Sequence, residues 1–257
     1  MAAASTRLVI LYGMGGLSDV GRHAIQVALE REPKIDLITI LTQHPELLEE
    51  NNWDCACPDG HFVSEEEKKR LKVITVTTWP KKGTEEDHEF TTHFSGASAV
   101  VACLGNRQPG FWDSRIKNGW VSYEGNQAVI RAMEANGIAR AVVISSVGIE
   151  EDRPPLEFHW AGKIMSWMFA TVSRRSFDDL TSMERAYRNS KLDFLLVRPV
   201  GISQDVKPVG RWVLQKEKGK DTVGFNMAKM DVARFMIEEA LNPSRHKTGV
   251  VIGAELP

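Results

Sequence analysis

The sequence predicts an α/β fold built on a doubly wound, mainly parallel sheet of seven strands with helices on both faces. Three observations predict it. The apolar run at residues 8–12 is followed by a glycine cluster and then by a helical pattern. Further apolar runs alternate with helical patterns along the chain. Runs such as residues 35–41 are almost continuously apolar, as in strands covered on both faces, so we expect a Rossmann-like sheet.

The expected elements follow one another along the chain. Strands are expected at residues 8–12, 36–41, 73–77, 97–104, 140–145, 194–197 and 250–252. Helices are expected at residues 19–30, 85–94, 121–135 and, in two pieces, 156–188. Asp231 is expected to cap a last helix, and the basic residues 207–220 are expected to be flexible.

Length and composition fit one domain over residues 1–257, with an inserted surface segment at 45–72 and a substrate-side region at 150–225. Ser64 and Glu67 have the spacing of a capping box, which predicts a helix start within the inserted segment. The charge run that follows Ser64 is expected to be a solvated face of this helix.

Composition excludes several classes of protein. Hydrophobic residues make up 42% of the chain, and the net charge of −2 provides no basic field for nucleic acid. No apolar run approaches the roughly 20 residues that span a bilayer. The three cysteines form neither a disulfide framework nor a metal site of the usual spacing. We expect a cytoplasmic monomer or homodimer, or one in an organelle stroma or matrix if the N-terminus is processed; a protein partner stays open.

The glycine cluster predicts a phosphate-binding turn. Glycine accepts a positive φ, and without a Cβ it lets a pyrophosphate approach the backbone at the N-terminus of the next helix. The spacing is irregular, so an ordinary tight turn is the alternative. The glycines expected to hold pyrophosphate are Gly13, Gly15, Gly16 and Gly21.

The end of the second expected strand carries no marker of cofactor type. An acidic residue there would bind the ribose of NAD, and a basic residue would take the 2′-phosphate of NADP. This chain has Thr42 and Gln43 instead. Arg22 could reach a 2′-phosphate, or it could be a solvated arginine in the first helical turn. We expect NADP(H) or NAD(H), with NADP(H) slightly favoured.

The fourth expected strand ends at a position where ligands bind open parallel sheets. Leu104, Gly105 and Asn106 follow it. The aromatic loop beyond them suggests a lid or a wall of the substrate site, and the alternative is that its rings anchor the loop on the core. The substrate-side residues are Arg107, Phe111 and Trp112.

The order of these features resembles the atypical short-chain dehydrogenase/reductases, in the NAD(P)H-binding branch of the NmrA-like proteins and the biliverdin-IXβ flavin reductases. Besides the glycine turn, the matching phrases are Leu104-Gly105-Asn106-Arg107, Glu124-Gly125-Asn126, Ala141-Val142-Val143-Ile144-Ser145-Ser146, Val197-Arg198-Pro199 and Asp231-Val232-Ala233. The resemblance implies a dinucleotide lying across the strand ends. It implies that Leu104, Gly105 and Asn106 lie beside the adenine ribose and the phosphates, and Ser145 and Ser146 near the nicotinamide. It also implies that Pro199, Val200 and Ile202 provide backbone contacts on the carboxamide side.

The catalytic set of the family is altered in this chain. Ordinary members use Ser, then Tyr about 13 residues later, then Lys four residues beyond. Here Ser146 is followed by His159 and Lys163. Residues 159 and 163 share one face of a helix, and histidine can donate a proton near neutral pH. The neighbouring Lys favours the neutral histidine, which opposes the acid role, and an ordinary polar helix face is the alternative.

Two functions follow from the resemblance. The first is an NAD(P)H-dependent oxidoreductase acting on a carbonyl, flavin-like or other planar small molecule. The second is a redox-sensing or assembly protein that binds dinucleotide without turnover, as NmrA-like members do. The missing Tyr favours the second function, and the retained Ser and Lys favour the first.

Overall fold

The structure is a computed structural model. It describes residues 5–13, 19–45, 63–105, 121–149, 167, 170–203, 206–214, 223–224 and 226–255. An eight-stranded sheet has the order β3-β2-β1-β4-β5-β6-β10-β8, and β7 and β9 form a separate two-stranded sheet. Every pairing in the large sheet is parallel except that of β10 with β8. The predicted Rossmann-like, doubly wound, mainly parallel sheet is therefore confirmed, with one strand, β8, beyond the seven that were expected.

Most element bounds lie close to those expected from the sequence, whereas residues 156–166 and 168–169 of the two-piece helix expected at 156–188 lie outside the described residues. The strands are β1 Arg7–Tyr12, β2 Leu37–Thr42, β3 Leu71–Thr75, β4 Ala99–Cys103, β5 Arg140–Ile144, β6 Asp193–Pro199, β7 Ile202–Ser203, β8 Val213–Leu214, β9 Met227–Ala228 and β10 Thr248–Gly253. The described helices are α1 Val20–Glu30, α3 Glu65–Lys68, α4 Glu85–Thr92, α5 Val121–Asn136, α8 Arg174–Asn189 and α9 Lys229–Leu241.

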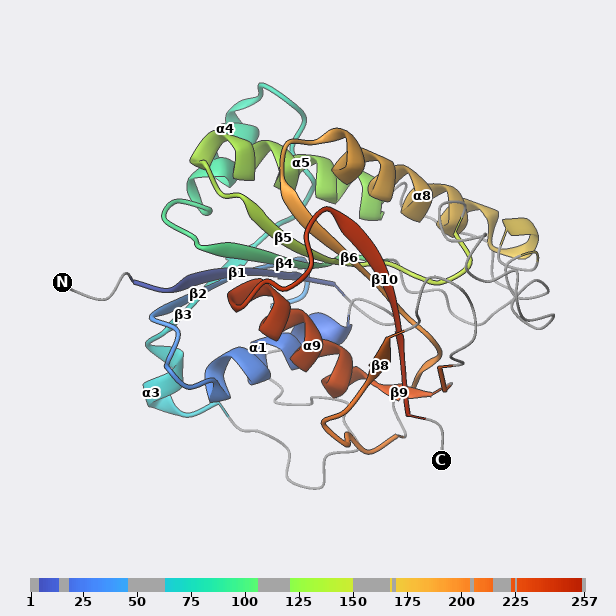
Figure 1. Cartoon of the computed structure of the whole chain (residues 1–257). Coiled ribbons are helices and arrows are strands. Elements are labelled where there is room, and N and C mark those ends of the chain that lie inside the picture. The colour runs from blue at the N-terminus through green and yellow to red at the C-terminus, as the bar shows by residue number, and fades with distance from the viewer. Residues whose placement is uncertain are drawn as a thin grey trace.

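Helices cover both faces of the sheet (Figure 1). Helices α1 and α9 lie side by side on one face, and α4, α5 and α8 lie on the other. Alternation along β1 explains how one strand serves both cores: Leu8 and Ile10 belong to the core under α1 and α9, whereas Val9 and Leu11 belong to the opposite core. In both cores the strands contribute mainly buried aliphatic side chains, which explains the continuous apolar runs in the sequence.

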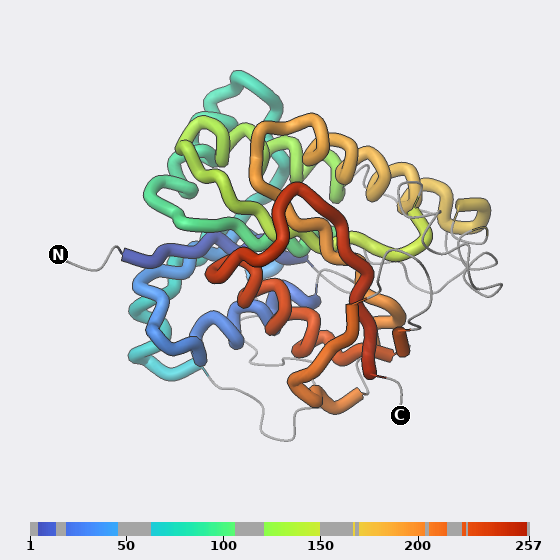
Figure 2. Tube along the Cα trace, viewed as in Figure 1, coloured from blue at the N-terminus to red at the C-terminus, as the bar shows by residue number. Residues whose placement is uncertain are grey.

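The strands follow one another outward from β1, first on one side of it and then on the other. In Figure 2 the trace first runs from β1 to β2 and β3, and then returns to β4 on the other side of β1 before it continues through β5 and β6 to β10. The winding direction therefore reverses between β1 and β4. Open parallel sheets bind their ligands at such a reversal, in a crevice beyond the carboxyl ends of the strands, and we call this edge of β1 and β4 the crevice.

Three expectations about elements were wrong in detail. Strand β3 begins at Leu71 and ends at Thr75, two residues earlier than expected, and it lies at the sheet edge with Val73 43% exposed. Within the stretch 207–220, expected to be flexible, residues 213–214 form β8, which pairs antiparallel with β10, whereas residues 215–220 lie outside the described residues. Helix α9 begins at Lys229 with Ala228 at its N-cap, so Asp231 is not the cap.

The carboxylate of Asp231 instead holds a loop. Its two oxygens accept the backbone N–H groups of Val209 and Gly210, each at 2.9 Å. These contacts fix the loop that leads into β8. The acid therefore stands three residues after the observed N-cap, Ala228, because the loop rather than the helix needs an acceptor.

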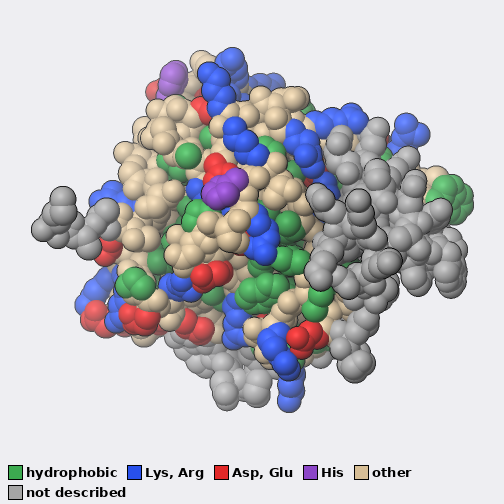
Figure 3. All heavy atoms as spheres, viewed as in Figure 1, with side chains coloured by type: hydrophobic (Ala, Val, Ile, Leu, Met, Phe, Trp, Pro, Cys, Tyr) green, Lys and Arg blue, Asp and Glu red, His purple; other side chains and the backbone are tan. Residues whose placement is uncertain are grey.

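The charge run after Ser64 behaves as expected. Ser64 and Glu67 form the predicted capping box, with Ser64 N donating to Glu67 Oε2 at 2.8 Å and Glu67 N donating to Ser64 Oγ at 3.3 Å. Lys68 and Lys69 pair with glutamates three residues earlier, and all four side chains are exposed. Figure 3 shows acidic and basic side chains mixed in this corner of the molecule. In the part of the chain that the structure describes, no helix combines the length and apolar character that a membrane span requires.

Candidate functional site at the carboxyl ends of β1 and β4

The crevice between β1 and β4 brings the two predicted phosphate-side segments together. Tyr12, the last residue of β1, is the register partner of Cys103, the last residue of β4. Gly13 and Leu104, which follow these strands, therefore leave the sheet at neighbouring positions on the same edge. Of the glycines expected in the turn, the structure describes Gly13 and Gly21, whereas Gly15 and Gly16 lie outside the described residues.

Gly21 allows helix α1 to lie close to the sheet. A Cβ at this position would overlap the Cβ of Tyr12 and would lie 3.1 Å from the Cβ of Cys103. The absence of a side chain therefore brings the first turn of α1 onto β1 and β4. This close approach is the role of the last glycine in a dinucleotide-binding turn, and it directs the helix N-terminus toward the crevice. A direct contact of Gly21 with pyrophosphate stays a prediction.

Among the described residues, no side chain caps the N-terminus of α1. Asp19 occupies the N-cap position, yet its carboxylate makes no capping hydrogen bond, and the first turn contains no acidic residue. The leading N–H groups and the positive end of the helix dipole are thus not neutralised by a side chain of this turn. Such an end suits an anion.

Arg22 is buried. Its exposed fraction is 2%, so the alternative of a solvated first-turn arginine is wrong. Its predicted role toward a 2′-phosphate is not tested by this burial and stays a prediction.

The end of β2 lies beside the crevice and is neutral. Thr42 is fully buried and its Oγ1 accepts the N–H of His44 at 2.9 Å. Gln43 is exposed, and its Nε2 donates to the carbonyl of Thr77 at 3.4 Å. Tyr12 Oη donates to the carbonyl of His44 at 3.0 Å, which fastens this segment to the end of β1. No carboxylate from residues 42–45 stands where an adenosine ribose would be bound in an NAD site.

The N-terminus of α5 holds the segment after β4. Ser122 Oγ donates to the carbonyl of Leu104 at 3.1 Å. The two carboxylate oxygens of Asp179, from α8, accept the N–H groups of Ser122 at 2.9 Å and Tyr123 at 2.8 Å. Burial raises the pKa of Asp179 above its ordinary value, against the lowering effect of these two N–H donors. Asp179 thus caps α5 from a different helix and positions Leu104 at the crevice.

A second set of buried contacts continues this network. Tyr187 Oη donates to Asn126 Oδ1 at 2.8 Å, and Asn126 Nδ2 donates to the carbonyl of Ser122 at 2.7 Å. Burial raises the pKa of the Tyr187 hydroxyl, which keeps it a donor. Sequence reasoning missed Asp179 and Tyr187, because nothing in their spacing shows that α8 reaches the first turn of α5.

The end of β5 carries the predicted nicotinamide-side serines. Ser145 is fully buried, and its Oγ has no hydrogen-bond partner among the described residues, although its N–H donates to the carbonyl of Val197 at 2.7 Å. Ser146 is half-buried, and its Oγ makes a local 3.3 Å contact with the carbonyl of Val147. His159 and Lys163, the other members of the predicted catalytic set, lie outside the described residues. The roles of all four residues stay predictions.

The segment after β6 is fixed by two neighbours. The N–H of Val200 donates to the carbonyl of Ile252 in β10 at 2.8 Å, so this donor is already used by the sheet. Ile202 lies in β7, opposite Met227 in β9. Pro199 is the last residue of β6 and is buried. The predicted contacts of these residues with a carboxamide are not tested. Four further predicted residues, Asn106, Arg107, Phe111 and Trp112, lie outside the described residues.

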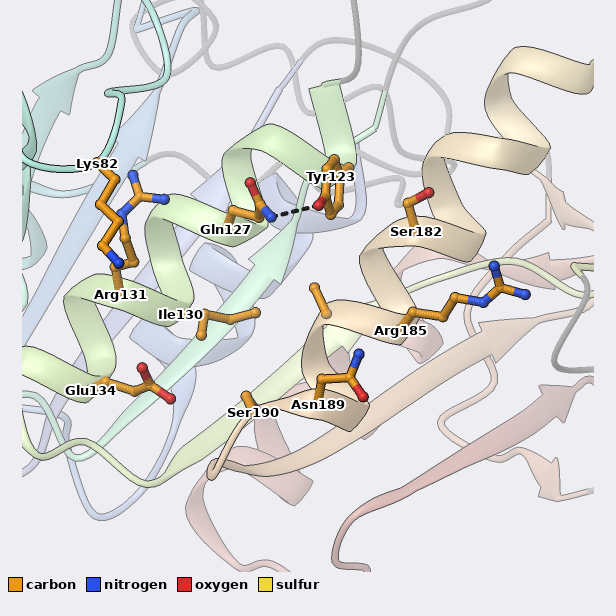
Figure 4. A pocket seen from close by; sticks show the side chains of 11 residues that line it. Lys82, Tyr123, Gln127, Ile130, Arg131, Glu134, Ser182, Arg185, Asn189 and Ser190 are labelled. Carbon is orange, nitrogen blue, oxygen red and sulfur yellow. Dashed lines mark hydrogen bonds between the residues drawn. The ribbon is translucent and has the colours of Figure 1, made fainter.

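A separate groove lies away from this edge, between α5 and α8 (Figure 4). It has a volume of about 610 Å³ and an open mouth, and Lys82, Gln127, Arg131, Glu134, Arg185 and Asn189 are among the side chains that line it. Arg131 is already paired with Asp87 at 2.8 Å, and Gln127 donates to Tyr123 Oη at 2.6 Å. Of the residues that line the groove, Tyr123 also belongs to the turn of α5 that Asp179 caps.

The described residues fit a dinucleotide. The crevice offers an uncapped helix N-terminus, a glycine at the end of β1, a close helix approach permitted by Gly21, and a buried serine hydroxyl whose partner is not among the described residues. Gly13, Leu104 and Gly105 would border the phosphate side of such a ligand.

Comparison with known proteins gives the same assignment. A family model described as NAD(P)H-binding matches residues 62–243, more than half of the chain. The UPF0659 protein YMR090W of Saccharomyces cerevisiae is 30% identical over 156 residues, which cover 61% of this chain and 62% of that protein. The match therefore spans less than two thirds of this relative's length.

Solved structures share the fold. An anaerobillin reductase, ChuY from Escherichia coli O157:H7, superposes with a TM-score of 0.64 at 19% identity, covering 98% of this chain and 99% of ChuY. A short-chain dehydrogenase/reductase from Veillonella parvula DSM 2008, solved in complex with NADP, gives a TM-score of 0.63 at 13% identity, covering 96% and 94%.

Proposed function

Because the chain belongs to the NAD(P)H-binding family, we propose that it is an NAD(P)H-dependent oxidoreductase of the atypical short-chain type. The substrate class is a carbonyl, flavin-like or other planar small molecule. Bound NAD(P)H supplies a hydride to such a substrate. The residues of this chain bind and orient the two molecules and provide a proton.

The observation that supports this proposal most strongly is the crevice between β1 and β4. The N-terminus of α1, where Asp19 makes no capping hydrogen bond, lies at this edge. The helix packs closely on the sheet because Gly21 has no side chain. Leu104 is held at the neighbouring strand end by Ser122. A diphosphate bound at this position would extend along the strand ends toward Ser145 at the end of β5.

In this proposal the proton is handled on the nicotinamide side. Ser146 polarises the substrate oxygen, and His159 donates the proton in the position where other family members have Tyr. Lys163 is assigned to the cofactor ribose. Arg107, Phe111 and Trp112 form the substrate wall. An unchanged turnover number in a His159→Ala variant would remove His159 from the mechanism.

The cofactor preference proposed is NADP(H) over NAD(H). The end of β2 carries no carboxylate, and a carboxylate there would repel a 2′-phosphate. Gln43 is exposed at this position and can donate to a phosphate. A lower Kd for NADPH than for NADH is expected, and equal or reversed values would contradict this preference.

A second candidate is a dinucleotide-binding sensor or assembly protein without turnover. It is favoured by a single sequence feature, namely the histidine that stands where family reductases carry their catalytic Tyr. Such a protein would still use the crevice between β1 and β4.

Fluorescence titration with NADH and NADPH, followed by oxidation assays with flavin, quinone and carbonyl acceptors, separates the candidates. Binding together with acceptor-dependent oxidation supports the reductase. Tight binding without oxidation across the panel supports the sensor. Failure to bind either dinucleotide would overturn both.

A further inference from the structure

A buried ion pair joins the starts of two helices that are far apart in the sequence. Lys229 Nζ lies 2.7 Å from Asp19 Oδ2. Asp19 is the N-cap residue of α1, and Lys229 is the first residue of α9. Their side chains are only 7% and 6% exposed. Helices α1 and α9 pack along one another on the same face of the sheet, so the pair closes the end of that packing nearest the crevice (Figure 1).

The ammonium of Lys229 lies at the N-terminus of α9, where the helix dipole disfavours a positive charge. A lysine at the first position of a helix is repelled by the positive end of the helix dipole, and burial adds a desolvation cost. Both costs are tolerated when a carboxylate lies within hydrogen-bond distance, as Asp19 does. A neutral residue at position 229 would destabilise α9 less than a lysine does. The stability of α9 therefore does not explain why a lysine stands there.

Asp19 lies in an equally unusual situation. An aspartate at an N-cap ordinarily accepts a backbone N–H of the first turn, but the carboxylate of Asp19 makes no such bond. It is bound by the ammonium of Lys229 instead. The first-turn N–H groups of α1 are thereby left without the side-chain anion that would compete with a phosphate for them.

His23 lies close enough to Asp19, Arg22 and Lys229 for their charges to act on it. Arg22 and His23, both in the first turn of α1, are 2% and 1% exposed. Burial, assisted by the charges of Lys229 and Arg22 and opposed by that of Asp19, lowers the pKa of His23 to about 4. His23 Nδ1 has no hydrogen-bond partner among the described residues. Asp19 thus shares its buried surroundings with a neutral imidazole and with the cations of Lys229 and Arg22.

Lys229 also connects the segment after β6, on the proposed nicotinamide side, to the start of α1, on the proposed phosphate side. It directly follows β9, and Met227 of β9 lies opposite Ile202 of β7 in a parallel pair. Strand β7 belongs to the segment after β6 that the family resemblance assigns to the nicotinamide side. The ammonium of Lys229 therefore ties this segment to the start of α1, on the phosphate side.

We propose that Lys229 is a positioning residue for the dinucleotide. Its ammonium draws the Asp19 carboxylate away from the leading N–H groups of α1 and neutralises it, so that these groups bind the diphosphate. The inference rests on the proposed use of this crevice for a dinucleotide. Lys229 acts through Asp19 and the helix, not on the reacting atoms.

Two single substitutions with opposite charge consequences test the proposal. In a Lys229→Met variant the aspartate remains as an uncompensated anion at the phosphate site, and the Kd for NADPH is expected to rise about tenfold or more. In an Asp19→Asn variant the cation remains, and the Kd is expected to stay unchanged or to fall. The double variant removes both charges and is expected to bind within about threefold of the parent chain. Isothermal titration gives the Kd, and urea unfolding of each variant gives the stability.

A merely structural pair would give a different pattern. Both single substitutions would then weaken binding in the same direction and in step with their loss of stability, and this result would overturn the proposal. If Lys229→Met does not fold, Asp19→Asn and the double variant still decide, because tenfold weaker binding by either one contradicts the proposal.

Two controls complete the experiment. Arg31 and Glu238 form another ion pair between α1 and α9, at 2.5 Å, near the opposite ends of these helices. An Arg31→Met variant is expected to leave the Kd for NADPH unchanged. Adenosine, which lacks the diphosphate, is expected to show no difference between the parent chain and Lys229→Met, whereas ADP-ribose should repeat the NADPH result. Absence of binding by the parent chain would overturn the proposed function and this inference together, whereas binding with parallel losses in both variants overturns the inference alone.

Discussion

The buried side chains of Arg198 and Glu184 are joined by two parallel hydrogen bonds. Arg198 Nε donates to Oε1 at 2.9 Å and Nη2 donates to Oε2 at 2.6 Å. The side chains are 5% and 0% exposed, and they connect β6 to α8. Gly249 in β10 makes room for the guanidinium, because a Cβ there would lie 3.1 Å from its Cζ. The pair fixes α8, which carries Asp179, against the central sheet.

Removal of the arginine is expected to destabilise the fold strongly. An Arg198→Met variant leaves a fully buried carboxylate without its main partner, and such changes cost about 3–5 kcal/mol in the free energy of unfolding. Urea unfolding followed by circular dichroism measures this loss. A double variant, Glu184→Gln with Arg198→Met, should recover a large part of it because no buried charge remains.

Arg188 provides the matched control for this prediction. It lies 3.7 Å from the same carboxylate and is 36% exposed. An Arg188→Met variant is expected to change the free energy of unfolding by less than about 1 kcal/mol. Equal losses for Arg188→Met and Arg198→Met would show that the two-point geometry is not what matters.

The cap that α8 provides for α5 yields a second prediction. An Asp179→Asn variant keeps one acceptor for the first-turn N–H groups of α5 and loses the other, at a cost of about 1–2 kcal/mol in unfolding free energy. Because Ser122 in this turn also holds the carbonyl of Leu104, the Kd for NADPH should rise as well. Chemical unfolding and dinucleotide titration on the same samples test both effects.

The neighbouring residue serves as its control. Asp178 is 41% exposed and pairs with Arg174 at 3.6 Å on the outer face of the same helix. Asp178→Asn should therefore leave both the stability and the Kd nearly unchanged. A weaker cofactor affinity in Asp178→Asn as large as in Asp179→Asn would point to a general effect of charge on α8.

A third prediction concerns the approach of α1 to the sheet. A Gly21→Ala variant places a methyl group into the Cβ of Tyr12, in a position where neither backbone can yield easily. Overpacking of this kind costs about 1–3 kcal/mol, and displacement of α1 should also abolish measurable dinucleotide binding. Unfolding midpoints and fluorescence titration provide the readouts.

Gly83→Ala controls for the general effect of replacing glycine. Nothing lies within 4 Å of a Cβ at Gly83, but its φ of +80° strains an alanine. We expect a moderate loss of stability of about 1 kcal/mol with unchanged Kd. If Gly21→Ala still binds NADPH like the parent chain, the close approach of α1 is not needed for the site.

The sequence was sufficient for the order of the elements but not for their long-range contacts. The seven parallel strands could be predicted because buried parallel strands are continuously apolar, and the capping box of Ser64 and Glu67 is a local pattern. Strand β8 could not, because two residues at an edge leave no periodic signal. Asp231 looked like a helix cap because it directly precedes an apolar helical pattern. Its carboxylate instead accepts the N–H groups of Val209 and Gly210, which lie more than twenty residues earlier.

The candidate site shows the same division. The glycine turn and the end of β4 could be located from the sequence, since each is a local break after an apolar run. The pairing of Asp19 with Lys229 could not, because 210 residues separate the partners. Glu184 and Arg188 have the spacing of an ordinary helical pair, and only the tertiary structure reveals that Arg198 is the principal partner of Glu184.

The last prediction concerns pH and His23. Burial, assisted by Lys229 and Arg22 and opposed by Asp19, lowers the pKa of His23 from 6.5 to about 4. Above pH 6.5 the imidazole is neutral in both the folded and the unfolded chain, so its contribution to stability is complete there. As the pH falls toward 4, the unfolded chain binds a proton that the folded chain does not, and the folded state loses about 3 kcal/mol relative to it.

A His23→Gln variant isolates this contribution. Both proteins are unfolded with urea at intervals between pH 7.5 and 4.5, and the difference in unfolding free energy is plotted against pH. The parent chain should lose stability more steeply than the variant below pH 6.5, because the carboxylates that titrate in this range are common to both. Parallel curves would mean that His23 binds its proton at the same pH in the folded and the unfolded chain, and hence that burial beside Lys229 and Arg22 does not lower its pKa.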